Sequence, residues 1–295
     1  MKTLDQYLKN SLNMHIGCEC IFNNEPILER NGIPDDVREI TEDIMELIDN
    51  NELNIDIRYS NMFINHIILN VIYDANRLLA EYEYEKTDYI NKEIYMNIYA
   101  NIKNQNIYDT QFFPIKKLIQ HELVHAYEDI SRYNNGCKVF SEIIKSEYNI
   151  FAYIVSNPSK QKQYNDIANA IYFLNDQERN AYLSELELDI KKIIKDNHIR
   201  YDNFDYNKII DNLNNNNWKR YIDIGKLIYM LNDNNNEYKW YRDMICRAYR
   251  KICNNANMSD NSIRKLLTNK WNKFDNKFKR YIAKIIYENL EHTIR

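Results

Sequence analysis

The sequence predicts an α+β protein that is predominantly helical, with a small mixed β-sheet packed on a central helix and a helical C-terminal lobe. Three observations lead to this fold class. Gly and Pro number only 4 each among 295 residues, which favours long helices over a turn-rich β-sandwich. Apolar residues alternate over much of residues 53–99, as in half-buried strands. From residue 114 onward they recur mostly at helical spacing.

The first element is expected to be a short helix over residues 1–12, because Leu4, Leu8 and Leu12 share one helix face. Residues 13–33 contain Gly and Pro breakers and are expected to be irregular. A second helix is expected from Pro34 to about Asp49. Its inward-facing residues recur every three or four positions: Val37, Ile40, Ile44, Leu47 and Ile48.

The sheet is expected to follow. Residues 53–59 alternate between apolar and polar side chains, and residues 63–73 are rich in Ile and Val, as in a more buried strand. Residues 80–84 alternate again and are expected to pair as a hairpin with residues 94–99. Helix remains an alternative for the last segment, because it also has helical spacing at Ile90, Ile94 and Ile98.

The remainder is expected to be almost entirely helical. Two Asn-rich runs, at 214–217 and 233–236, predict polar loops. The expected helices cover residues 143–155, 161–174, 177–195, 218–231, 238–253 and 262–291. We expect two domains, a sheet-containing domain over residues 1–200 and a basic helical lobe over residues 201–295.

The composition bears on the cellular location of the protein and on its binding partners. No run of 18 or more apolar residues occurs and the N-terminus has no signal-peptide core, so we expect no membrane association. The five cysteines form no C-x-x-C pair, which predicts reduced thiols and a cytoplasmic protein. Net charge is -4, yet residues 218–295 hold 17 Lys and Arg against 8 Asp and Glu. That asymmetry indicates either an acidic partner such as nucleic acid or two lobes that attract each other, and we favour the second.

The motif His121-Glu122-Leu123-Val124-His125 is the strongest functional signal in the chain. A helix is expected from Pro114 to about Ile130, with Gly136 beyond its end. On a helix, His121 and His125 stand one above the other and can both bind one Zn²⁺. Glu122 flanks the metal and can act as a general base on bound water, as in zinc metallopeptidases. The alternative is two surface histidines on a charged helix face.

A catalytic zinc site usually has three protein ligands and one open position. No third His follows in H-x-x-G-x-x-H spacing, so the third ligand is expected to be an acidic residue on a later helix. The candidates there are Glu178 and Glu185.

Together, His121-Glu122-x-x-His125 after a small sheet and Glu178-x-x-Ala181-Tyr182 on a later helix resemble the glutamate zincins. The resemblance covers about residues 53–190. It implies that Glu178 binds the zinc and that small Ala181 lets the two helices pack closely. It also implies a zincin fold, and a phage or bacterial source would place the protein in the host cytoplasm or a virion interior.

Several alternatives remain open from the residues themselves. Asn175 and Glu178 have the spacing of a capping box, which would explain Glu178 without any metal. Glu185 or Glu128 could instead be the third ligand. The resemblance also implies a later His or Tyr that stabilises a tetrahedral oxyanion, for which His198 and Tyr201 are the candidates. His66 lies in an apolar strand and is expected to be a hydrogen-bonded core residue.

The resulting hypothesis is a zinc-dependent metallopeptidase. His121, His125 and Glu178 would hold Zn²⁺, and Glu122 would activate the zinc-bound water. The substrate would be a peptide or protein added as a strand to a sheet edge, rather than nucleic acid. The alternative is a non-catalytic protein of the same fold, for example in a phage particle, whose basic lobe binds nucleic acid or an acidic partner.

Overall fold

The computed structural model describes residues 33–60, 62–101, 105–137, 139, 176–199, 218–252 and 255–291. The chain divides into two compact units. The sheet unit comprises residues 25–144 and 180–185, and the helical unit comprises residues 1–24, 145–179 and 186–295. Helix α7 (Asp176–Asp196) runs through both, since its residues 180–185 group with the sheet unit.

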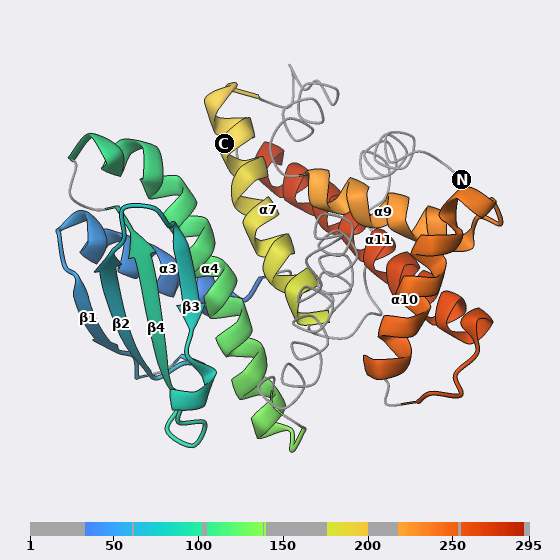
Figure 1. Ribbon diagram of the computed structural model, residues 1–295. Helices are drawn as coiled ribbons and strands as arrows, with labels where there is room; N and C mark the ends of the chain where they lie inside the picture. The colour runs from blue at the N-terminus through green and yellow to red at the C-terminus, as the bar shows by residue number, and fades with distance from the viewer. Residues whose placement is uncertain are drawn as a thin grey trace. The chain divides into compact units, whose positions relative to one another are not determined.

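The described strands of the sheet unit form one mixed sheet. Their order is β1-β2-β4-β3, which leaves β3 at one edge (Figure 1). Strand β2 pairs parallel with β4, while β1 pairs antiparallel with β2 and β3 pairs antiparallel with β4. The elements are α3 (Asp35–Asp49), β1 (Asn54–Arg58), β2 (His66–Tyr73), β3 (Leu79–Tyr82), the 3-10 turn η1 (Tyr84–Lys86), β4 (Glu93–Ala100) and α4 (Gln105–Asn134).

The core of the sheet unit lies on one face of the sheet. Successive strand residues point to opposite faces, so one face collects the apolar set. On β4 this set is Ile94, Met96, Ile98 and Ala100, all buried. Helix α4 contacts both β3 and β4, and α3 contacts α4. Removal of these side chains from water is the main force that holds helices and sheet together.

Helix α3 follows the predicted apolar pattern with one exception. Val37, Ile40, Ile44 and Ile48 are buried as expected, whereas Leu47 is half-exposed. At 100° per residue Leu47 lies at the margin of this face.

Helix α4 begins earlier than predicted. It starts at Gln105, so Pro114 lies inside the helix and not in its first turn. A proline removes one backbone donor, and here that loss does not end the helix. The predicted stop is confirmed: Gly136 has φ 66° and donates to the carbonyl of Tyr133 at 3.0 Å, while Cys137 donates to that of Arg132 at 2.9 Å. This pair of bonds is a Schellman ending, which requires the left-handed conformation that glycine adopts freely.

In the helical unit, three described helices contact one another. A Cβ on Gly225 of α9 would lie 3.2 Å from the Trp271 ring of α11, so glycine permits this close approach. Arg242 of α10 donates to the carbonyls of Asp233 and Asn235, which closes the Asn-rich loop. The elements are α9 (Trp218–Asn232), the 3-10 turn η4 (Asn236–Tyr238), α10 (Lys239–Ile252) and α11 (Asp260–Glu291).

The predicted α+β class, the helical predominance and the small mixed sheet are confirmed. Segment 94–99 is a strand, which excludes its helical alternative. The helices expected over residues 1–12, 143–155 and 161–174 lie outside the described residues, and the domain boundary expected at residue 200 stays a prediction. No helix of the described ranges is long and apolar enough to cross a membrane.

Two of the five cysteines belong to the described residues, and both are free: Cys137 is exposed and Cys246 is buried. Burial raises the pKa of the Cys246 thiol to about 11, which keeps it protonated. Cys18, Cys20 and Cys253 lie outside the described ranges.

His66 joins three strands on the outer face of the sheet. Its Nδ1 lies 2.5 Å from a carboxylate oxygen of Glu93, and its Nε2 lies 2.8 Å from one of Asp56. Ionised carboxylates only accept hydrogen bonds, so both ring nitrogens donate and the ring is an imidazolium. Burial alone would lower the pKa of His66, but the hydrogen bonds to Glu93 and Asp56 outweigh this effect and raise that pKa.

This network predicts a pH-dependent contribution to stability. Because the folded-state pKa of His66 is raised, its contribution is fully present below the unfolded value of 6.5 and is lost as pH rises through the folded value. His66→Gln should therefore lower the urea midpoint more at about pH 5.5 than at about pH 8.5. Equal losses at both pH values would contradict the imidazolium assignment.

Candidate metal centre

The two motif histidines meet on one face of α4. His121 and His125 are one helical turn apart, and their Nε2 atoms lie 3.1 Å from each other. Two ligands at about 2.0–2.1 Å from one tetrahedral zinc ion lie about 3.3 Å apart. His125 is buried and His121 is half-buried, so the alternative of two surface histidines is wrong.

Helix α7 packs directly on this part of α4. Gln120 donates from Nε2 to the backbone carbonyl of Ser184 at 2.9 Å, and Ala181 and Ser184 are fully buried. A side chain reaches a carbonyl within another helix only where the two helices lie close together, which small residues permit. Asn180 also donates to Glu128.

The direction of α7 follows from these contacts. Asn180 meets Glu128, whereas Ser184 meets Gln120, so the chain advances along α7 as it recedes along α4. The two helices are therefore antiparallel in this region. This direction decides which acidic side chain of α7 meets which part of the motif.

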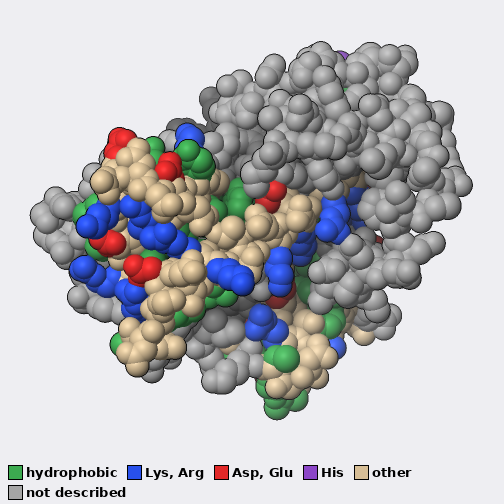
Figure 2. All heavy atoms as spheres, turned by 90° about the vertical axis from the view of Figure 1, so that its right-hand side faces the viewer, with side chains coloured by type: hydrophobic (Ala, Val, Ile, Leu, Met, Phe, Trp, Pro, Cys, Tyr) green, Lys and Arg blue, Asp and Glu red, His purple; other side chains and the backbone are tan. Residues whose placement is uncertain are grey.

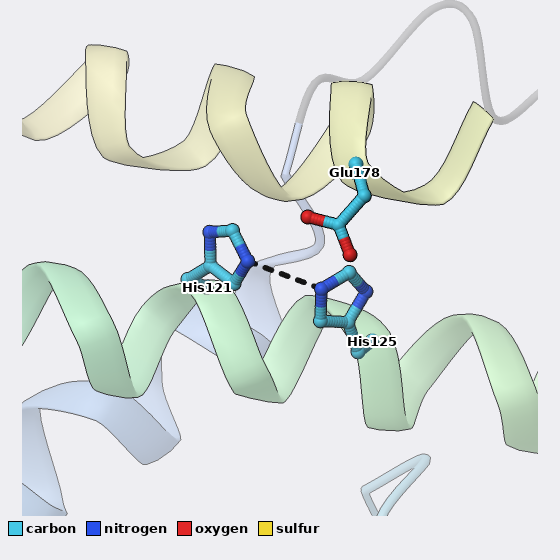
Figure 3. Close-up of side chains that lie close together, drawn as sticks. All are labelled: His121, His125 and Glu178. Atoms are coloured by element: carbon cyan, nitrogen blue, oxygen red, sulfur yellow. Dashed lines mark hydrogen bonds between the residues drawn. The ribbon is translucent and has the colours of Figure 1, made fainter. Parts of the chain in front are cut away.

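Glu178 joins the histidines as the third member of the cluster. One potential ligand atom from each of Glu178, His121 and His125 lies within 4.8 Å of the others. The Glu178 side chain points from α7 toward the facing histidines of α4 (Figure 3). Its residue is buried, where an isolated carboxylate would be costly and a cation nearby would stabilise it.

Glu185, the other candidate on α7 for the third ligand, contacts the His121 ring from its other side. Its Oε1 lies 2.7 Å from Nδ1 of His121, the ring nitrogen that faces away from the cluster. Since the carboxylate accepts, Nδ1 carries the proton, and in a neutral ring Nε2 then keeps its lone pair free for a metal. Glu185 thus orients His121, and the alternative that makes it the third ligand is not favoured.

Glu122 lies outside the cluster of three. Its Oε2 accepts a hydrogen bond of 3.1 Å from the backbone N–H of Tyr82, on edge strand β3. The residue is half-buried. The carboxylate next to the first histidine therefore contacts the edge of the sheet.

Other polar side chains near the motif or near α7 lie away from the cluster or outside the described residues. Asp129 is fully buried and accepts a hydrogen bond from Tyr89 at 3.4 Å. His198 follows the C-terminal end of α7, about five turns after Glu178, too far along the helix to reach the cluster. Tyr201 and Asn175, the cap residue of the expected capping box, lie outside the described residues.

The donor set fits a metal cation. Two imidazole nitrogens and one carboxylate oxygen form the ligand group of several catalytic zinc sites, although other divalent ions also accept it. The distance between the two Nε2 atoms is close to that expected for two ligands of a tetrahedral ion. The Glu185 carboxylate at Nδ1 of His121 also agrees with metal binding, because it orients the ring. The two Nε2 atoms lie within hydrogen-bond distance of each other, so a cation bound by both nitrogens would take the place of that hydrogen bond.

Sequence reasoning missed two contacts, the support of His121 by Glu185 and the bond from Tyr82 to Glu122. The seven-residue spacing of Glu178 and Glu185 indicates a shared helix face, but the direction of α7 relative to α4 was needed to place them. Comparisons of the chain with protein-family models, curated proteins and solved structures gave no match.

The first expected outcome concerns metal content. The protein should bind about one Zn²⁺ per chain, and His121→Ala or His125→Ala should abolish binding because each removes one of three ligands. Elemental analysis after dialysis against zinc measures this. The matched control is His66→Gln, which alters a histidine of the same unit outside the cluster. Failure of the unaltered protein to bind zinc at neutral pH would exclude the site.

The carboxylates of α7 should differ in their effect on affinity. Glu178→Gln should weaken zinc binding strongly, while Glu185→Gln should weaken it by about tenfold, as expected for loss of a residue that orients a ligand. Competition with a fluorescent chelator compares both with Glu46→Gln, an exposed control on α3. The capping explanation predicts instead that Glu178→Gln binds zinc like the parent.

Proposed function

We propose that the protein is a zinc-dependent metallopeptidase of the glutamate-zincin type. His121, His125 and Glu178 would hold the ion, and Glu185 would keep His121 in the correct tautomer. When bound, zinc supplies a Lewis acid that lowers the pKa of water toward about 7 and polarises a carbonyl. Zinc is favoured because two imidazoles and one carboxylate leave an open fourth position.

In this proposal Glu122 is the general base. It follows a ligand on the same helix yet is not part of the ligand cluster, so it can act as a base without binding the ion itself. It would accept the proton of the attacking water and donate it to the amine that leaves when the peptide bond breaks. The same atoms are then ready for the next cycle.

The substrate class is inferred from the edge strand. Strand β3 ends the described sheet, and an extended peptide can add to such an edge through its backbone. The hydrogen bond from Tyr82 to Glu122 joins that edge to the proposed base. A peptide strand on β3 would thus lie beside the group that acts on it, which favours peptides over other hydrolysable substrates.

A single observation carries the proposal: the Nε2 atoms of His121 and His125 face each other at 3.1 Å beside the Glu178 carboxylate. Imidazole rings that only pack in a core do not require facing nitrogens together with a buried carboxylate.

A second candidate is a non-catalytic protein that uses the helical unit to bind nucleic acid. Lys and Arg side chains gather on the face shown in Figure 2. Along α11, Lys265, Lys273 and Arg280 are exposed, whereas Asp275, which is the one acid between residues 261 and 287, is buried. A surface of this kind attracts phosphates. We favour the peptidase, because charged helix faces are often simply hydrated.

Glu122→Gln tests the proposal. It preserves the size of the side chain but removes the base, so the zinc-loaded variant should retain its metal and lose about 10²–10⁴-fold in the rate of peptide hydrolysis. Mass spectrometry of a random peptide mixture measures the new termini. Glu81→Gln, an exposed change on β3, is the control and should retain activity.

Cleavage by Glu122→Gln at the parental rate would assign the activity to another site or to a contaminant. Absence of cleavage by the parent protein, combined with nucleic-acid binding that weakens steeply with added salt, would favour the second candidate.

A further inference from the structure

The backbone of β3 presents alternate groups to its two sides. Glu83, the residue after Tyr82, donates to the carbonyl of Tyr95 at 2.8 Å, so its N–H faces β4. Tyr82 is the register partner of Met96, one position away. In an antiparallel ladder, successive residues point their N–H and C=O groups in opposite directions. The N–H of Tyr82 therefore faces away from β4, on the open side of the strand.

Glu122 uses this outward donor. Its carboxylate accepts from the Tyr82 N–H at 3.1 Å, which satisfies a backbone group that the sheet itself leaves without a ladder bond. The neighbouring strand residues Ala80 and Tyr82 are buried through their side chains, whereas Glu81 is exposed on the other face. The contact is thus made by the strand edge and not by side-chain packing.

An extended peptide that adds to β3 needs the same donor. Strand addition proceeds through the outward N–H and C=O groups of alternate residues, here those of Ala80 and Tyr82. One N–H cannot form a full-strength bond with both a peptide carbonyl and a carboxylate. The two acceptors therefore exclude each other.

We propose that Glu122 acts as a latch on the edge of β3, and that an extended peptide displaces its carboxylate from the Tyr82 N–H. The displaced carboxylate would then be free to turn toward the ligand cluster on the same helix. The catalytic consequence rests on the proposed function, but the competition for Tyr82 requires neither zinc nor hydrolysis. Ligand binding and release of the base are in this way a single event.

Peptide binding in the presence of EDTA tests the latch, because chelation prevents cleavage. The probe is a fluorescein-labelled mixture of end-blocked random peptides of about six residues, the length of an ordinary strand, and the readout is fluorescence anisotropy. Glu122→Ala removes the competing acceptor and should tighten apparent binding by about three- to tenfold, the net worth of one hydrogen bond. Glu81→Ala likewise removes one negative charge, here from an exposed side chain of β3, but leaves the outward donors of the strand in place, and should leave binding unchanged.

A second arm removes the donor. Replacing Tyr82 by its α-hydroxy acid analogue turns the preceding amide into an ester, which deletes the outward N–H. The change also makes the Glu81 carbonyl, which faces β4, a weaker acceptor. Circular dichroism verifies the fold. In this background peptide binding should weaken, and Glu122→Ala should no longer change it, which is the coupling expected of two groups that share one bond.

The latch would be overturned if Glu122→Ala binds the peptides like the parent protein, or if Glu81→Ala tightens binding as much as Glu122→Ala does. It would also be overturned if neither the parent protein nor any variant binds the peptides. The comparison of the two alanine variants stands even where the ester protein does not fold. Loss of the proposed peptidase activity in a separate assay would leave these outcomes unaffected.

Discussion

The close antiparallel contact between α4 and α7 is the constraint on which the candidate site depends. The bond from Gln120 to the Ser184 carbonyl joins the two helices, and the buried small residues beside it allow the approach. Each helix alone carries an incomplete set of groups. Only their opposed directions bring Glu178 to the facing nitrogens of the histidines and Glu185 to the outer nitrogen of His121.

The carboxylates around the motif have three different physical tasks. Glu178 faces the nitrogens that a metal would bind, Glu185 fixes the proton of one imidazole, and Glu122 bonds to the sheet. All are chemically alike, so their roles follow from what each one touches. A cation in the cluster would reduce the cost of burying Glu178, which relates metal binding to the stability of the site.

Strand β3 connects the sheet to this chemistry. As an edge strand it has outward backbone groups that must be satisfied by water, a partner or a side chain. Glu122 satisfies one of them in the free protein. The same arrangement that protects the edge from unwanted pairing would make it selective for a ligand that can replace a carboxylate.

The sequence by itself determined the local structure and the chemical hypothesis. Helical periodicity placed His121 and His125 on one face, alternation placed the strands, and Gly136 marked the end of α4, because these features depend on neighbours within a few residues. The sequence misplaced the start of α4. Proline is common in the first turn of a helix, but it does not exclude helical turns before it. The tertiary structure decided the rest. The direction of α7, the contact of Glu185 with His121, the imidazolium at His66 and the bond from Tyr82 to Glu122 all depend on residues at least ten positions apart, and spacing along the chain does not determine such contacts.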